Sequence, residues 1–189
     1  RGTMRLFFLS AISGPFGVSR TTVRDYLTLL HQVFLVEELP AWHTNQLKRL
    51  VKTPKLHMTD TGLACALLGV EVDDLREDRT LLGQLLETFV VQELRRQASG
   101  WEHDLRFSHY RDKDQLEVDL VLERGPNRVV GIEIKASATL RDSDRRGLER
   151  LRDAVGSRFC CGALLYDGET LVPMGDRIYA IPLRMIWGG

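Results

Sequence analysis

The sequence predicts an α/β protein of two units, a small unit of one helix and two strands over residues 1–72 and an α/β sandwich with a central mixed sheet over residues 73–189. The first observation is the spacing of apolar residues. They recur at helical spacing in some segments, and short apolar runs, typical of strands, lie between these segments. Charge is the second. Residues 1–60 hold eight Lys and Arg against four Asp and Glu, whereas residues 61–189 hold 18 against 22.

The first unit is expected to open with a helix that Ser19 caps, because serine side chains accept hydrogen bonds from the free N–H groups of a first turn. Polar and basic side chains then point outward from this end, as they do in helices that read DNA bases and phosphates. The candidate nucleic-acid contacts on the helix are Arg20, Thr21 and Arg24.

Two predicted strands, 33–39 and 55–59, follow this helix and enclose a basic loop. Helix, strand, basic loop and strand is the order of a winged helix-turn-helix, in which the loop is the wing. The alternative is a solvated hairpin that only packs the two units together. A short helix is expected over 60–68, and an acidic linker over 71–78 is expected to lead into the second unit. The candidate nucleic-acid contacts on the loop are Lys48, Arg49 and Lys52.

The second unit is expected to begin with a long helix and to continue with a three-stranded meander, a second helix and two further strands. This order is typical of an α/β sandwich. The expected helices are 80–98 and 143–155, and the expected strands are 105–110, 117–123, 129–136, 159–166 and 177–181.

The meander carries the most informative pattern. A turn centred on Pro126 places Asp119 opposite Glu133 and Glu117 opposite Lys135. Directly opposed residues have Cβ atoms about 4.5–5.5 Å apart. Two carboxylates at that distance repel each other unless a cation bridges them or one of them takes up a proton. Oxygen ligands of this kind suit Mg²⁺ or Mn²⁺.

A third carboxylate belongs to the same pattern. Glu87 shares a helix face with Val90 and Leu94 inside an otherwise apolar stripe. A carboxylate in apolar surroundings is costly unless it has a partner. We therefore expect Glu87 to point toward the other two acids; the alternative is an edge position from which it reaches solvent.

These residues resemble the PD-(D/E)XK nuclease superfamily, whose pattern is an acidic residue on the first helix, an Asp on one strand and Glu-x-Lys on the next. The matching positions are Glu87, Asp119, Glu133 and Lys135. The chain also resembles the C-terminal region of an uncharacterised prokaryotic AAA-type ATPase family, in which a winged helix and a nuclease-like domain follow a P-loop module. The motifs that carry this resemblance include Lys-x-Pro-Lys-Leu (52–56), Asp60-Thr61-Gly62-Leu63 and Tyr110-Arg111.

The resemblance implies metal-dependent hydrolysis of a phosphodiester. Asp119, Glu133, Glu87 and the backbone carbonyl of Ile134 would hold Mg²⁺ or Mn²⁺, with Asp119, Glu133 and Lys135 as the catalytic residues. Glu117 and Arg111 would lie just outside this group. The alternatives are a catalytically silent nucleic-acid-binding or regulatory module of the ATPase, and a structural dimerisation module that uses Trp42 or Trp187.

Absent motifs narrow the function further. No G-x-x-x-x-G-K-[ST] occurs, so ATP binding is expected only in an N-terminal ATPase module joined to this chain in cis. Because the sequence starts with Arg1 rather than Met, we expect it to be part of a longer protein.

Three cysteines without a CxxC pair argue against a zinc site and for a reducing cytoplasm. The sequence contains no run of 18 apolar residues, so we expect no membrane span. The oligomeric state and the choice between DNA and RNA stay open.

Overall fold

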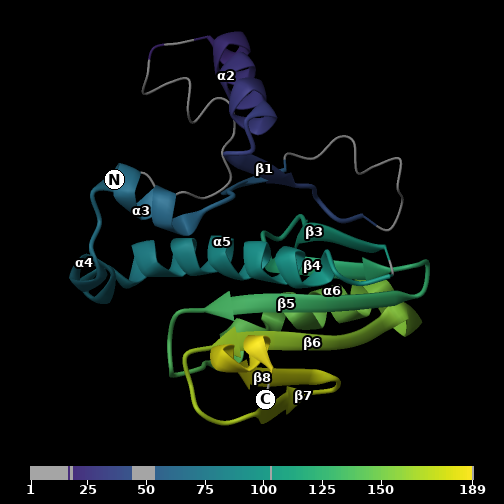
Figure 1. Ribbon diagram of the computed structural model, residues 1–189. Helices are drawn as coiled ribbons and strands as arrows, with labels where there is room; N and C mark the ends of the chain where they lie inside the picture. Colours follow the sequence, from purple (N-terminus) through teal and green to yellow (C-terminus); the bar gives the residue numbers. More distant parts are fainter. Residues whose placement is uncertain (1–16, 18, 44–53, 103, 189) are drawn as a thin grey trace.

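The computed structural model describes residue 17 and residues 19–43, 54–102 and 104–188. It is a mixed α/β structure with a central mixed sheet, as the sequence predicts, and this sheet has six strands (Figure 1). The helices are α2 (Arg20–Gln32), α3 (Thr61–Leu68), α4 (Val72–Glu77), α5 (Arg79–Ala98) and α6 (Arg146–Val155). Within the described residues, no helix is both long and apolar enough to cross a membrane.

The large sheet has the order β3-β4-β5-β6-β8-β7. Its first three strands form an antiparallel meander, and α6 then connects β5 to a parallel β6, which in turn pairs parallel with β8. The edge strand β7 was not among the predicted strands. The bounds are β3 (Leu105–Arg111), β4 (Glu117–Arg124), β5 (Arg128–Lys135), β6 (Phe159–Tyr166), β7 (Val172–Gly175) and β8 (Ile178–Pro182).

Helices cover both faces of this sheet, with α5 on one side and α6 on the other (Figure 1). Val90 and Val91 of α5 pack in one apolar cluster with the isoleucines of β5. Leu148 and Leu151 of α6 pack in a second cluster that includes Phe159. Trp42 is buried in this second cluster against the ring of Tyr110, and so, unlike the half-exposed Trp187, it is not a surface contact for a second copy. Burial of both faces is what makes this sheet a stable central layer.

The small unit holds α2 and a two-stranded antiparallel sheet of β1 (Val36–Leu39) and β2 (Lys55–Met58). The Ser19 hydroxyl accepts the N–H of Thr22 at 3.1 Å, which confirms the predicted cap. The strand predicted over 33–39 begins only at Val36, because α2 runs on to Gln32 and Phe34 turns the chain with φ +59°.

The acidic segment 71–78, predicted as a linker, is instead largely the helix α4. The N–H of Glu71 donates to the Asp74 carboxylate at 2.8 Å and so satisfies a free backbone donor at the start of this helix. Carboxylates in a first turn are also favoured by the helix dipole. The acidic composition therefore stabilises a helix end here and does not indicate an irregular segment.

The regular alternation of side chains along β4 breaks at Asp119. Two steps on β3, from Ser108 to Tyr110, match three steps on β4, from Val121 to Val118. Val118 consequently packs in the cluster beneath α6, whereas Leu120 packs in the cluster beneath α5. Strict alternation along β4 would place these two residues on the same face, and the bulge prevents this. The bulge re-aims Asp119 at the edge of the site.

Candidate functional site

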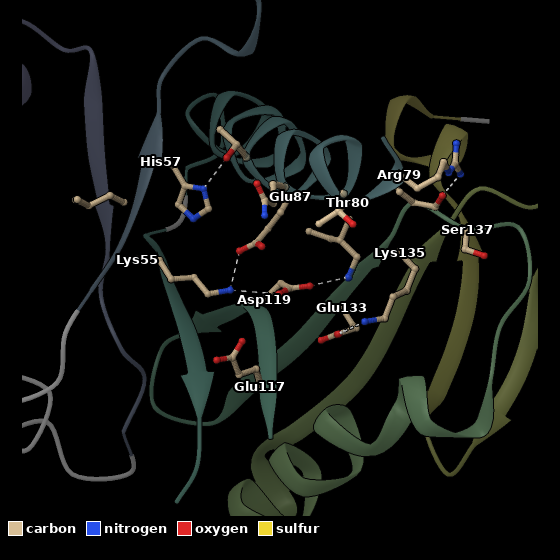
Figure 2. A pocket seen from close by; sticks show the side chains of 16 residues that line it. Lys55, His57, Arg79, Thr80, Glu87, Glu117, Asp119, Glu133, Lys135 and Ser137 are labelled. Atoms are coloured by element: carbon tan, nitrogen blue, oxygen red, sulfur yellow. Dashed lines mark hydrogen bonds and ion pairs between the residues drawn. The ribbon is translucent and has the colours of Figure 1, made fainter. Parts of the chain in front are cut away.

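A cavity of about 530 Å³ lies where α5, β2 and the ends of β4 and β5 meet (Figure 2). Its lining contains four carboxylates, two lysines, one arginine and one histidine. These side chains are Glu87, Glu117, Asp119 and Glu133, Lys55 and Lys135, Arg79, and His57. All four predicted acidic residues and the predicted lysine therefore line one cavity.

The predicted register between β4 and β5 is confirmed where the two strands pair. Arg124 pairs with Arg128 and Leu120 with Ile132, as a turn centred on Pro126 requires. The ladder ends there, one residue before Asp119 and Glu133. The Asp119 carboxylate instead accepts the backbone N–H of Ile134 at 3.0 Å, so it bridges the two strands beyond their last pair.

Lys55 is the site residue that sequence reasoning missed. Its ammonium group lies 2.6 Å from the Glu87 carboxylate and 3.2 Å from that of Asp119 (Figure 2). Burial alone would lower the pKa of this lysine, but the charges of Asp119 and Glu87 outweigh burial and raise it. Lys55 is therefore a fixed cation between two of the three predicted metal-binding carboxylates. In the sequence, Lys55 belongs to the motif Lys-x-Pro-Lys-Leu (52–56) and to a predicted strand, and neither indicates a contact with Glu87 or Asp119.

Glu133 and Lys135 form a second ion pair, with 2.7 Å between the ammonium group and Oε1. The other carboxylate oxygen, Oε2, is buried and has no hydrogen-bond partner among the described residues. Burial, followed by the charge of Asp119, raises the pKa of Glu133 to about 8. Within a protein interior an unsatisfied charged oxygen is costly. Glu133 is thus ready to accept a proton or a cation.

Glu87 responds to the same surroundings. Burial, followed by the charge of Asp119, raises its pKa to about 7, although the contact with Lys55 acts in the opposite direction. The position of the Glu87 carboxylate confirms neither of the two expectations, which were metal ligation and an edge position open to solvent. The structure places the Glu87 carboxylate against Lys55.

The predicted pairing of Glu117 with Lys135 is not seen. Glu117 lies 3.0 Å from Arg111 instead, and the guanidinium of Arg111 also donates to Gln115. The reason is that β4 begins at Glu117 beside the end of β3, whereas its ladder with β5 has already stopped at Leu120. Glu117 lines the cavity, whereas Arg111 is not among the lining residues.

His57 also points into this region from β2 and is 4% exposed. Its Nδ1 lies 3.1 Å from the Thr88 hydroxyl, and its Nε2 is buried without a hydrogen-bond partner among the described residues. Burial, followed by the charge of Lys55, lowers the pKa of His57 to about 3. The imidazole is therefore neutral at physiological pH.

The side chains present fit a hard divalent cation in part. Asp119 and Glu133 supply oxygen ligands, and Oε2 of Glu133 has no hydrogen-bond partner among the residues that the structure describes. In the described ranges, however, no three His, Cys, Asp or Glu side chains come together as one metal-binding group. The fit is thus to the carboxylates of Asp119 and Glu133 alone, with Glu87 held by Lys55.

The predicted nucleic-acid contacts lie far apart in the chain, and the structure describes some of them. Thr21 and Arg24 are exposed on the first turns of α2, as expected. The side chain of Arg20 and the whole of Lys48, Arg49 and Lys52 lie outside the part that the structure describes.

Comparisons with known proteins place this architecture in a family. The family described as "Domain of unknown function (DUF4143)" matches residues 82–186, and a second one, "Domain of unknown function (DUF8612)", matches residues 2–74. The uncharacterized proteins Rv2008c of Mycobacterium tuberculosis and Mb2031c of Mycobacterium bovis are each 31% identical to this chain over 182 residues. These matches cover 96% of the chain but only 39% of either relative. Solved structures give no significant match. The chain belongs to the DUF4143 family.

Proposed function

We propose that this chain is the nuclease-like, DNA-binding C-terminal part of an AAA-type ATPase, and that its cavity hydrolyses phosphodiesters with Mg²⁺ or Mn²⁺. The observation that carries the proposal is the buried Oε2 of Glu133, which has no hydrogen-bond partner in the described part of the chain. Glu133 lines the same cavity as Asp119 and forms an ion pair with Lys135 through its other oxygen. A buried carboxylate oxygen without a partner is rare in folded proteins, and binding of a cation explains it.

Each residue near Glu133 has a distinct role in this proposal. Asp119, Glu133 and the backbone carbonyl of Ile134 would hold the cation, and the Asp119 carboxylate is already positioned by the N–H of Ile134. A bound divalent cation would polarise the scissile phosphate and lower the pKa of a water molecule. Lys135 would orient that water and offset the charge that develops on the phosphate.

The remainder of the chain supports a nucleic-acid substrate. The cavity volume of about 530 Å³ admits a phosphate group with its flanking sugar, and Arg79 lies at its rim beside Ser137 (Figure 2). In the small unit, α2 presents exposed Thr21 and Arg24 at its N-terminal end, and we interpret it with β1 and β2 as a winged helix. The chain spans about two fifths of its curated relatives, 39% of each, so the ATPase module and cytoplasmic location are part of the proposal.

One observation favours a second function. Lys55 already forms ion pairs with both Glu87 and Asp119, and Lys135 forms one with Glu133. A site whose acids are ion-paired in this way can persist without metal. The second candidate is therefore a catalytically silent nucleic-acid-binding or regulatory module with the same fold.

A thermal unfolding series and a cleavage assay separate the two functions. Mn²⁺ is expected to raise the melting temperature of the wild type, and Asp119→Asn and Glu133→Gln are expected to lose that shift. The wild type should nick plasmid DNA in Mn²⁺, while Lys135→Ala should bind Mn²⁺ but lose cleavage. Lys113→Ala, at an exposed lysine, is the matched control and should behave as the wild type. Metal binding without cleavage of DNA or RNA would support the silent module, and an equal shift in all variants would remove the metal site.

A further inference from the structure

Lys55 reaches the cavity from a different part of the fold than Glu87 and Asp119 do. Glu87 belongs to α5 and Asp119 to β4, whereas Lys55 belongs to β2 of the small two-stranded sheet. Along β2, Lys55 and His57 are buried and alternate with the partly exposed Leu56 and Met58. The strand therefore turns one face into the cavity and brings a cation with it.

Contacts on several sides hold β1 and β2 in this place. His57 contacts Thr88 of α5, and the Met58 carbonyl accepts a hydrogen bond from Gln92 at 3.3 Å. Just after β1, the N–H of Trp42 donates to the carbonyl of His109 at 2.6 Å. The small sheet is thus bound to both α5 and β3, which fixes the reach of the Lys55 side chain.

The ammonium group of Lys55 places a positive charge between two carboxylates, as a bound metal ion would. It contacts one oxygen of each, Oε1 of Glu87 and Oδ1 of Asp119, and both of these side chains are largely shielded from solvent. A divalent cation that binds Asp119 and Glu133 must approach the same Asp119 carboxylate. Like charges in such a shielded site repel strongly, because little water is present to screen them.

We infer that Lys55 is a tethered counter-ion that competes with the divalent cation for Asp119, so that the small sheet limits how tightly the cavity binds metal. This inference rests on the proposed metal site at Asp119 and Glu133. Displacement of the ammonium group would release Glu87 as a further oxygen ligand. The competition therefore links metal loading to the position of β2.

Titration of the purified chain with Mn²⁺ alone tests the inference, with free Mn²⁺ measured by electron paramagnetic resonance. Lys55→Met, which keeps the side-chain length without the charge, is expected to bind Mn²⁺ at least tenfold more tightly than the wild type. Lys55→Arg retains the charge and is the matched control, with affinity no higher than that of the wild type.

A second pair of variants covers loss of folding in Lys55→Met. Glu87→Gln and Lys55→Met/Glu87→Gln both leave Asp119 and Glu133 intact, and the double variant should bind Mn²⁺ at least tenfold more tightly than the single. If the wild type binds Mn²⁺ and removal of the ammonium group leaves the affinity equal or weaker, the inference is wrong. The proposed function would then still stand. No Mn²⁺ binding by any variant would overturn both.

Discussion

The ammonium group of Lys55 lies 2.6 Å from the carboxylate of Glu87, although 32 positions separate the two residues in the chain. The same group reaches Asp119 at 3.2 Å. Side-chain exposure is 10% for Lys55 and 24% for Glu87, so the pair is largely withdrawn from solvent. The ion pair joins a strand of the small sheet to the helix that covers the large one.

Removal of the Lys55 charge should therefore destabilise the fold. Lys55→Met leaves Glu87 and Asp119 facing each other without a cation, and loss of one partner of a buried pair costs about 3–5 kcal/mol. The measurement is the free energy of unfolding in urea without added metal. Arg76→Met is the control, since the pair of Arg76 with Asp73 is exposed and worth at most about 1 kcal/mol. Equal losses for the two variants would contradict the prediction.

Gly147 near the start of α6 should not tolerate a side chain. A Cβ at this position would lie 2.0 Å from the backbone oxygen of Glu117, so β4 or α6 must shift. Overpacking of this kind costs about 1–3 kcal/mol. We expect Gly147→Ala to lower the free energy of unfolding by that amount and to move the margin of the cavity. Unchanged stability would mean that the two elements are less closely packed.

Gly83 offers the opposite case on α5. A Cβ there meets no atom of the described residues within 4 Å, and Gly83 lies inside a helix. Alanine favours the helical conformation over glycine by about 0.5–1 kcal/mol. Gly83→Ala should therefore raise the free energy of unfolding by about this amount, measured in the same urea series. A loss of stability would indicate that the cavity wall needs glycine at this position.

Local patterns predicted the parts of the site that are close together in sequence. The turn around Pro126 determines how β4 pairs with β5. The sequence alone therefore predicts that Asp119 and Glu133 are neighbours, although the observed ladder ends one pair before them. The apolar stripe of α5 likewise placed Glu87 toward the sheet. These predictions needed only the two periodicities of helix and strand.

Lys55 could not be placed in this way, because 64 positions separate it from Asp119 and no local period connects them. A basic residue beside a predicted wing also has an obvious solvent-exposed interpretation. The bulge at Asp119 escaped prediction for a similar reason, since strict alternation is the default for a strand and only the pairing with β3 reveals the extra residue.

The buried His57 predicts a specific dependence of stability on pH. Its pKa falls from 6.5 to about 3 on folding, so the unfolded chain binds more protons than the native chain between these values. Stability from this residue is present above pH 6.5 and is lost as the pH falls toward 3. The slope contributed by one such group is at most about 1.4 kcal/mol per pH unit.

Urea unfolding between pH 4 and 7 measures this slope. His57→Gln removes the titrating ring, so its stability should fall less steeply with acid than that of the wild type. Carbon-detected NMR of the His57 ring should show no protonation above pH 4 in the native state. A midpoint near 6.5, or equal slopes in both proteins, would contradict a buried neutral imidazole.

The basic residues predicted between β1 and β2 should govern affinity for nucleic acid. Lys48→Ala/Arg49→Ala is expected to weaken binding to duplex DNA of any sequence, because contacts to phosphates carry no sequence information. Each lost contact should reduce the slope of log K against log salt by about 0.9. Fluorescence anisotropy at several salt concentrations measures both effects, with Arg76→Ala on α4 as a control of equal charge type. An unchanged slope in the double variant would assign this segment to packing alone and would leave α2 as the DNA-contacting element.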